Sequence, residues 1–376
     1  MKKICYVATI PAVVNSFLRD HIQAAAEFYS VTIVCNFEDQ HLLDGLNARI
    51  NFLPIERKPS PSKDLQVLFK LFKFFQNERF DIVHTHMPKT GLLGMLAAKF
   101  AGVPIRINTF HGEVWTTRSG WQRKVLKLLD QLVSLLATNI LVVSPSQQTF
   151  LVKEGILPLG KANVIGSGSI CGVNPVRFHP DSDIRFTLRN NLGIAQAAIV
   201  ILFVGRLNQD KGMLDLANAF NVIAKQNPNV ILLLVGSEED VSFSQIQSIC
   251  EAVSDRLHYV SFTSTPEHYM AAADIFCLPS YREGLPMTIL ESAACSIPTV
   301  ASRIYGITDA VEDGKTGILF TAGDIAGLTQ ALLKLIDDVH LRQEMGIAAK
   351  QRALELFPSH KITAGVMALY SELLSN

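Results

Sequence analysis

Short apolar runs alternate with longer helical patterns along the whole chain, and this alternation restricts the fold more than any other feature. Ile4–Ala8 and Val31–Cys35 are apolar runs of the kind that form buried parallel strands, and a helical pattern from about Asn15 to Tyr29 separates them. A strand, a helix and a second parallel strand form a right-handed crossover. The sequence therefore predicts an α/β fold with doubly wound parallel sheets.

The alternation is interrupted once, which indicates two domains. A loop rich in glycine and serine begins at Gly166, and a new series of strands starts at Ile199. A length of 376 residues, 48% of them hydrophobic, is enough for two ordinary domain cores. We expect an N-terminal domain over residues 1–168, a C-terminal domain over 169–357 and a final helix over 358–376.

The two halves of the chain carry opposite net charge. Residues 1–168 contain 19 Lys and Arg against 12 Asp and Glu, a net charge of +7, whereas 169–376 contain 15 against 22, a net charge of −7. A basic N-terminal half can face an anionic membrane or an anionic substrate. The pattern over 63–76, rich in Phe and Leu with three lysines, fits either a core-packed helix or an interfacial membrane helix. We expect no nucleic-acid partner, and the sequence does not indicate an oligomeric state.

The cysteines and the apolar runs predict a cytoplasmic location. Six cysteines are present without a Cys-x-x-Cys pair, and several lie in apolar runs, as reduced core cysteines do. The run from Ile4 to Val14 is too short for a signal peptide, and no stretch of about 18 apolar residues is present to span a bilayer.

Histidines follow several predicted strands of the N-terminal domain. Ligands of open α/β sheets bind beyond the carboxyl ends of the strands, where we expect His84, His86 and His111. His84 and His86 are two positions apart on a strand and point the same way, as two metal ligands would, but no third ligand is nearby and we predict no metal. The first strand–helix turn, at Pro11, lacks the glycines that an NAD-binding turn requires.

The segment from Pro279 to Pro298 has the strongest functional signal. Pro286 is expected to open a helix that ends near Cys295. Glu283 then precedes the helix and Glu291 lies inside it. Between the two carboxylates, Gly284, Leu285 and Pro286 bring unpaired backbone amides and the positive end of the helix dipole together, which favours a diphosphate. A nucleotide sugar has the matching shape.

A second loop supplies cations. Gly205 and Arg206 follow a predicted strand, and Lys211 follows five residues later. A forked guanidinium and a point ammonium suit a diphosphate, and together with the helix start they can stabilise a departing diphosphate without a divalent metal.

These motifs resemble a known family. The spacing of Glu283 and Glu291 matches the E-x7-E signature of GT-B-fold glycosyltransferases, and FVGRLNQDKG over 203–212 is similar to the phosphate loop of family 4. Asp81–His86 and Phe110–Gly112 resemble N-terminal elements of the same family. The resemblance extends over nearly the whole chain. It implies two Rossmann-like domains that face each other across a cleft, with the nucleotide in the C-terminal domain and a last helix that crosses back.

The resemblance also implies roles for single residues. Arg206 and Lys211 would hold the diphosphate, Glu283 the donor sugar and Glu291 the ribose, and His111 would lie near the reacting centre. The reaction would retain the anomeric configuration and need no metal or other cofactor. Many members carry a Gly-Gly pair in the first loop. Here that place is taken by residues 11–14, so we expect this loop to shape the acceptor side together with His84 and His86.

The expected activity is the transfer of a sugar from a nucleotide donor, with UDP favoured, to a lipid-linked saccharide. The pattern resembles bacterial enzymes that extend undecaprenyl-diphosphate-linked sugars for O-antigen or capsule, which would place the chain peripherally on the inner face of the cytoplasmic membrane. Two alternatives stay open: a nucleotide-sugar epimerase of the same fold, and a non-catalytic nucleotide-sugar-binding protein.

Overall fold

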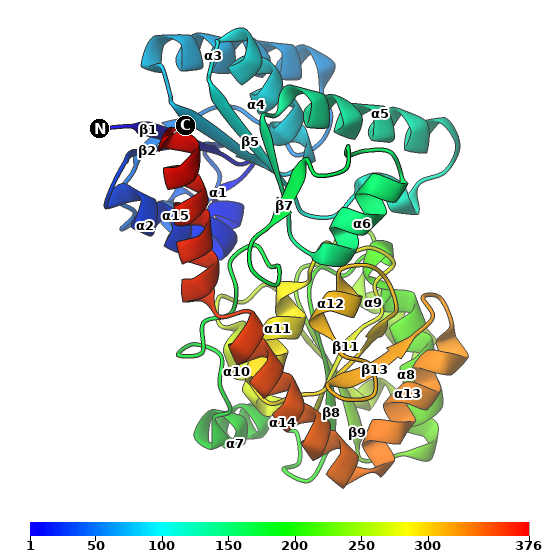
Figure 1. Cartoon of the computed structure of the whole chain (residues 1–376). Coiled ribbons are helices and arrows are strands. Elements are labelled where there is room, and N and C mark those ends of the chain that lie inside the picture. The colour runs from blue at the N-terminus through cyan, green and yellow to red at the C-terminus, as the bar shows by residue number, and fades with distance from the viewer. Residues whose placement is uncertain (376) are drawn as a thin grey trace. The chain divides into compact units, whose positions relative to one another are not determined.

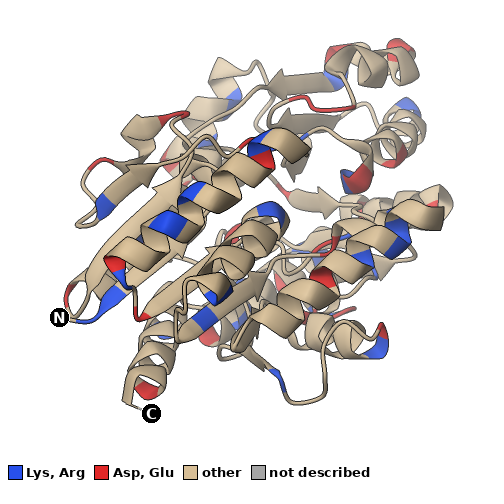
Figure 2. Ribbon diagram, turned by 90° about the horizontal axis from the view of Figure 1, so that it is seen from above, with Lys and Arg blue, Asp and Glu red and all other residues tan. Residues whose placement is uncertain are grey.

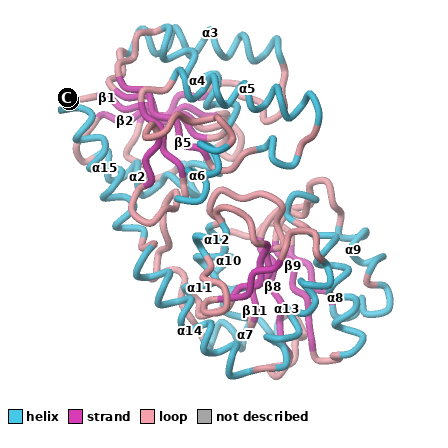
Figure 3. The backbone as a smooth tube through the Cα atoms, turned by 45° about the vertical axis from the view of Figure 1, so that its right-hand side comes forward, coloured by secondary structure: helices cyan, strands magenta, loops and turns pink. Residues whose placement is uncertain are grey.

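The structure is a computed structural model that describes residues 1–375, and the chain divides into two compact units (Figures 1 and 3). Met1–Cys171 and the C-terminal helix α15 (Ser359–Ser375) form unit 1, and Gly172–Pro358 form unit 2. Each unit has its own parallel sheet with helices on the outside (Figure 3). The α/β fold with two doubly wound sheets is therefore confirmed.

Unit 1 is built on a seven-stranded sheet with the order β3-β2-β1-β4-β5-β6-β7, and all its strands pair in parallel. The order reverses between β1 and β4, and the carboxyl ends of both strands meet at that point. The predicted strands at the start of the chain are present, while the edge strand β3 was not predicted. The strands are β1 (Lys3–Val7), β2 (Ser30–Cys35), β3 (Arg49–Phe52), β4 (Ile82–His86), β5 (Ile105–Phe110), β6 (Asn139–Val142) and β7 (Ala162–Val164).

Helices cover both faces of this sheet. On one face α3 (Pro61–Glu78), α4 (Pro88–Phe100) and α5 (Gly120–Leu136) lie next to one another (Figure 1), and α15 packs against α2 (Arg19–Ala26). The first helix begins at Pro11, earlier than predicted, and passes through a π-helical turn at Val14–Leu18. The remaining helices are α1 (Pro11–Val13) and α6 (Pro145–Lys153), with 3-10 turns at Gln40–Leu43 and Val114–Thr117.

Unit 2 repeats the arrangement with six parallel strands in the order β10-β9-β8-β11-β12-β13. Its order reverses between β8 and β11. The strands are β8 (Ile199–Val204), β9 (Val230–Val235), β10 (Leu257–Val260), β11 (Ile275–Leu278), β12 (Thr299–Ser302) and β13 (Gly317–Phe320). The helices are α7 (Ser182–Asn191), α8 (Met213–Gln226), α9 (Phe243–Ile249), α10 (Pro266–Ala272), α11 (Met287–Ala294), α12 (Ile307–Ala310), α13 (Ile325–Asp337) and α14 (Val339–Leu356), with 3-10 turns at Gln209–Lys211 and Glu251–Arg256.

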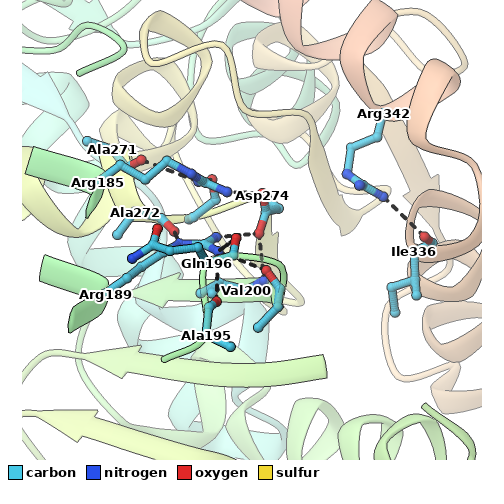
Figure 4. Close-up of polar contacts among 12 residues, drawn as sticks. Arg185, Arg189, Ala195, Gln196, Val200, Ala271, Ala272, Asp274, Ile336 and Arg342 are labelled. Carbon is cyan, nitrogen blue, oxygen red and sulfur yellow. Dashed lines mark hydrogen bonds and ion pairs between the residues drawn. The ribbon is translucent and has the colours of Figure 1, made fainter. Parts of the chain in front are cut away.

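A buried ion pair ties β8 and β11 together at their amino ends (Figure 4). Asp274 accepts hydrogen bonds from Arg189 at 2.7 Å, from Arg185 at 2.7 Å and from the backbone amide of Val200 at 2.7 Å. The Arg189 side chain is fully buried and also donates to the backbone carbonyl groups of Ala272, Gln196 and Ala198. The pair therefore fixes the strands whose opposite ends carry the predicted functional loops.

Among the described residues, no helix combines the length and the apolar character that a membrane-spanning segment needs.

Candidate active site

The loops after β8 and β11 meet at the point where the strand order of unit 2 reverses. The Tyr281 amide donates to the carbonyl of Asp210 at 2.8 Å, and the Arg282 guanidinium donates to the Asp210 carboxylate at 2.8 Å. Gly212 lies so close to the second loop that a Cβ atom there would be 2.1 Å from the carbonyl oxygen of Pro279. Because Gly212 also has a φ of +70°, only glycine fits without strain. The two predicted loops thus form one structure.

Lys211 and Glu283 are brought together by this contact. The Lys211 ammonium lies 2.5 Å from Oε1 of Glu283, and the Ser280 hydroxyl donates to the same oxygen at 2.7 Å. Ser280 is fully buried and both charged side chains are largely buried. The predicted diphosphate cation and the predicted sugar-binding carboxylate therefore face each other. Ser280 was not predicted, although a hydroxyl side chain only three positions before Glu283 can reach the Glu283 carboxylate.

The helix that follows Glu283 begins as the sequence suggests, with one difference. Pro286 is the N-cap residue, with φ −74° and ψ 116°, and α11 starts at Met287 rather than at the proline. Gly306, after β12, approaches this segment so closely that a Cβ atom would lie 2.0 Å from the carbonyl oxygen of Gly284. Leu285 is buried. The turn ahead of α11 is therefore held in place by its neighbours, with the positive end of the helix directed at the Glu283 loop.

Arg206 binds a different carboxylate from the one that Lys211 binds. Its guanidinium binds both carboxylate oxygens of Glu239, at 2.5 and 2.7 Å, and Asn208 donates to the same carboxylate at 2.6 Å. Glu239 follows β9, and nothing in the local sequence of Arg206 points to it. The structure keeps Arg206 and Gly205 at the carboxyl end of β8, as predicted, but it pairs the guanidinium with an acid that we did not predict.

Glu291 lies on α11 and is half-buried. Burial raises the pKa of its carboxyl group to about 7, the nearby positive charge of Arg177 opposes this rise, and the negative charge of Glu267 adds to it. Arg177 itself pairs with Glu267, with 3.0 Å between the donor and acceptor atoms. The predicted ribose-binding carboxylate is therefore poised to change its charge near neutral pH.

The three predicted histidines of unit 1 form one cluster beside the carboxyl end of β4. The rings of His84 and His86 are 4.2 Å apart between centroids, and Nδ1 of His86 lies 3.2 Å from Nε2 of His111. Tyr6 stacks on both strand histidines. Burial lowers the pKa of His84 to about 3 and that of His111 to about 4, and it lowers the pKa of His86 as well. All three rings are therefore neutral at physiological pH.

His84 and His86 differ in their remaining contacts. Both ring nitrogens of His84 are bound, Nδ1 to the hydroxyl of Tyr370 at 2.6 Å and Nε2 to the hydroxyl of Thr109 at 2.7 Å. This pattern favours a structural part for His84, because no ring nitrogen is left for a ligand. Nε2 of His86 is buried and has no partner among the described residues. Tyr370 comes from the far end of the chain, so local sequence could not reveal it.

Pro11, the other predicted acceptor-side residue, is the first residue of α1 and is buried. The backbone next to the histidines is strained, because Met87 has a φ of +73°. Among residues 1–375, no group of three or more His, Cys, Asp or Glu side chains is arranged to hold a metal ion.

Comparisons with known proteins identify the class. A family model described as "Glycosyl transferases group 1" matches residues 184–352, and one described as "Glycosyl transferase 4-like domain" matches residues 18–168. Together they account for most of the chain. The chain therefore belongs to the glycosyltransferases of the GT-B fold, and it is a transferase enzyme.

Two relatives and one solved structure are similar to this chain over most of their length. The chain is 28% identical over 329 residues to the "Capsular polysaccharide biosynthesis glycosyltransferase CapM" of Staphylococcus aureus, covering 87% of this chain and 86% of the relative. It is 29% identical over 348 residues to the "UDP-Gal:alpha-D-GlcNAc-diphosphoundecaprenol alpha-1,3-galactosyltransferase" of Escherichia coli, covering 89% and 88%. The structure of Anabaena Alr3699/HepE in complex with UDP and glucose has a TM-score of 0.82 at 19% identity, covering 99% and 100% of the two chains.

Proposed function

We propose that this chain is a retaining glycosyltransferase that needs no metal ion and moves a sugar from a UDP-sugar to an undecaprenyl-diphosphate-linked saccharide in the synthesis of a bacterial surface polysaccharide. The observation that carries the proposal is the pairing of Lys211 with Glu283 where the loops after β8 and β11 meet, in front of the start of α11. A cation, a carboxylate and a helix start at one place suit a diphosphate joined to a sugar.

On the donor side, the charges of the site fit a leaving diphosphate. In the proposed complex the Lys211 ammonium donates a hydrogen bond to the phosphates as well as to Glu283. Glu283 accepts hydrogen bonds from the sugar hydroxyls. The acceptor hydroxyl oxygen bonds to the anomeric carbon on the face where the bond to the diphosphate oxygen breaks, and the hydroxyl proton passes to the departing diphosphate. Lys211, Arg206 and the helix start stabilise the negative charge that develops there.

On the acceptor side, we assign the histidine cluster of unit 1. His111 and His86 are neutral at pH 7, so they can exchange hydrogen bonds with hydroxyl groups without adding charge. The name of the E. coli relative describes an acceptor on diphosphoundecaprenol, which supports a lipid-linked acceptor for this chain. An acceptor anchored in a membrane in turn favours peripheral attachment to the inner face of the cytoplasmic membrane.

A transfer assay tests this proposal. The purified chain is incubated with UDP-sugars and a synthetic prenyl-diphosphate-linked N-acetylglucosamine, with and without EDTA, and the products are separated by mass and anomeric configuration. We expect a glycosylated lipid with the donor's configuration and the same rate with EDTA. Conversion of the donor without acceptor would instead support the epimerase alternative, and a rate that falls with EDTA and returns with Mg²⁺ would contradict metal independence.

Donor affinity should depend on pH through Glu291. The carboxylate form accepts two hydrogen bonds from a ribose diol, and with a pKa of about 7 this form is replaced by the protonated acid as the pH falls from 8 to 6. Affinity for a UDP-sugar should therefore fall about tenfold over that range, following the ionised fraction. Calorimetric titration at several pH values measures this. Glu291→Gln should bind weakly at every pH, and an unchanged slope in that variant would exclude Glu291 as the cause.

A further inference from the structure

Helix α5 packs with its charged side facing the protein. The Arg123 guanidinium lies 5.3 Å and the Lys127 ammonium 5.1 Å from the centre of the Trp115 ring, which is only 1% exposed. Both cations also pair with one carboxylate oxygen of Glu154, at 3.1 and 2.8 Å. Asp130, on the same helix, accepts a hydrogen bond from the Trp115 indole at 2.8 Å. Charged groups that usually face water thus hold α5 against unit 1.

The opposite side of α5 consequently presents apolar side chains to the solvent. Trp121, Val125, Leu128 and Leu135 follow a spacing of four, three and seven residues, which places them in one row on a helix. Trp121 is 72% exposed, Leu128 62% and Leu135 77%. We name these four residues the α5 row. A soluble surface normally scatters such side chains singly, so a continuous row indicates a binding surface.

The neighbouring helices extend the same kind of surface. α4 packs between α3 and α5. On α3, Leu65 and Phe69 are exposed, whereas Val67 and Leu71 are buried, so this helix serves both the core and the surface. Phe100 at the end of α4 is exposed as well. The two sequence interpretations of residues 63–76 are therefore both compatible with α3.

The free charges on these three helices are positive. The three helices contain 8 Lys and Arg against 3 Asp and Glu, a net charge of +5. The acids within α3 and α5 are engaged: Asp64 with Lys89 at 2.6 Å, Glu78 with Arg49 at 2.7 Å, and Asp130 with Trp115. Lys70, Lys99 and Lys124 form no ion pair with any residue that the structure describes. Figure 2, seen from above, shows Lys and Arg along the helices of this layer.

We propose that the α5 row, with Leu65 and Phe69 of α3, docks on an anionic lipid bilayer. This inference refines the membrane attachment in the proposed function by naming the surface. Trp and Leu side chains enter the boundary between headgroups and acyl chains, and the lysines beside them bind lipid phosphates. A second copy of the chain fits less well, because the centre of a protein interface is depleted in lysine, whereas the exposed Lys124 lies beside the row.

Vesicle flotation tests the surface without donor or acceptor. Wild-type chain is mixed with vesicles of phosphatidylcholine alone or of phosphatidylcholine with phosphatidylglycerol. We expect flotation only with the anionic vesicles. Leu128→Gln/Leu135→Gln should weaken binding at least about tenfold, because two apolar side chains no longer enter the lipid. Lys70→Glu/Lys124→Glu should weaken it at least about tenfold by reversing two favourable charges. Ile347→Gln is the matched control, since Ile347 is equally exposed on α14 of unit 2, and it should float like wild type.

The two tryptophans provide an independent measurement. The chain contains only Trp115 and Trp121, one buried and one exposed. Anionic vesicles should shift the emission of the wild type to shorter wavelength, and Trp121→Phe should remove the shift while the Trp115 emission stays. The shift in the wild type reports docking even if the Leu128→Gln/Leu135→Gln variant is poorly folded.

Several outcomes overturn the inference. The first is flotation that does not depend on anionic lipid, and the second is an emission shift that persists in Trp121→Phe. The third is absence of flotation together with a doubled mass in light scattering, where the mass returns to that of a monomer in the Leu128→Gln/Leu135→Gln variant. In the last case a second copy covers the row. Failure of the proposed function is distinguishable, because it would abolish transfer to a water-soluble short-chain acceptor while flotation remained.

Discussion

Replacing Lys211 by alanine is expected to lower kcat for sugar transfer about a hundredfold, the loss typical of one group that stabilises charge in the transition state. The ammonium lies 2.5 Å from Glu283 where the loops after β8 and β11 meet, and the proposed function places the charge of the leaving diphosphate there. Glu283→Ala should lower kcat at least about tenfold. The substitution removes the carboxylate that pairs with Lys211 and that accepts hydrogen bonds from the hydroxyl groups of the donor sugar. Both variants are measured at saturating donor and acceptor.

Lys315→Ala is the matched control for this prediction. Lys315 also pairs with a glutamate in unit 2, at 3.2 Å, but it lies on the surface in the segment after α12. Its removal should leave kcat within about twofold, because an exposed pair contributes little. Turnover of Lys211→Ala and Glu283→Ala at the wild-type rate would contradict the assignment of this site.

The second large effect concerns stability. Arg189→Ala should lower the free energy of unfolding of unit 2 by about 3–5 kcal/mol, because it leaves Asp274 without its buried partner and three carbonyl groups without a donor. Arg185→Ala, which removes the more exposed partner of the same carboxylate (Figure 4), should cost less than about 1 kcal/mol.

Urea titration separates the two units. Both tryptophans lie in unit 1, so fluorescence follows unit 1 while circular dichroism follows the whole chain. For Arg189→Ala we expect an earlier circular dichroism transition and an unchanged fluorescence transition. If the two arginine variants lowered the free energy of unfolding equally, the fully buried guanidinium of Arg189 would contribute no more to stability than the more exposed one of Arg185.

The sequence predicted the fold because its signals are local and repeated. Apolar runs of four to six residues mark the parallel strands, and the break at Gly166 separates the two series. The edge strand β3 was not predicted, because Arg49–Phe52 is short and only partly buried and its sequence pattern resembles that of a loop. The start of α11 was predicted within one residue, since proline restricts the backbone before and after it.

The partners within the site could not be predicted in the same way. Glu239 reaches Arg206 from the loop after β9, and Tyr370 reaches His84 across 286 positions of the chain. Such pairs depend on which loops the topology brings together, which no short window of sequence contains. The orientation of α5 is a similar case, because only the positions of Trp115 and Glu154 decide that Arg123 and Lys127 face inward.

In the proposed function, the loops after β8 and β11 bind the diphosphate of a nucleotide sugar, and the roles of Lys211 and Glu283 depend on this binding. A thermal-shift series with UDP-, GDP- and ADP-sugars on the wild type and Lys211→Ala tests it directly, because a ligand that binds only the folded state raises the melting temperature. We predict that the UDP-sugars raise the melting temperature of the wild type by several degrees and that of Lys211→Ala by far less. An equal rise in both proteins, or no rise with any nucleotide sugar, would contradict the claim.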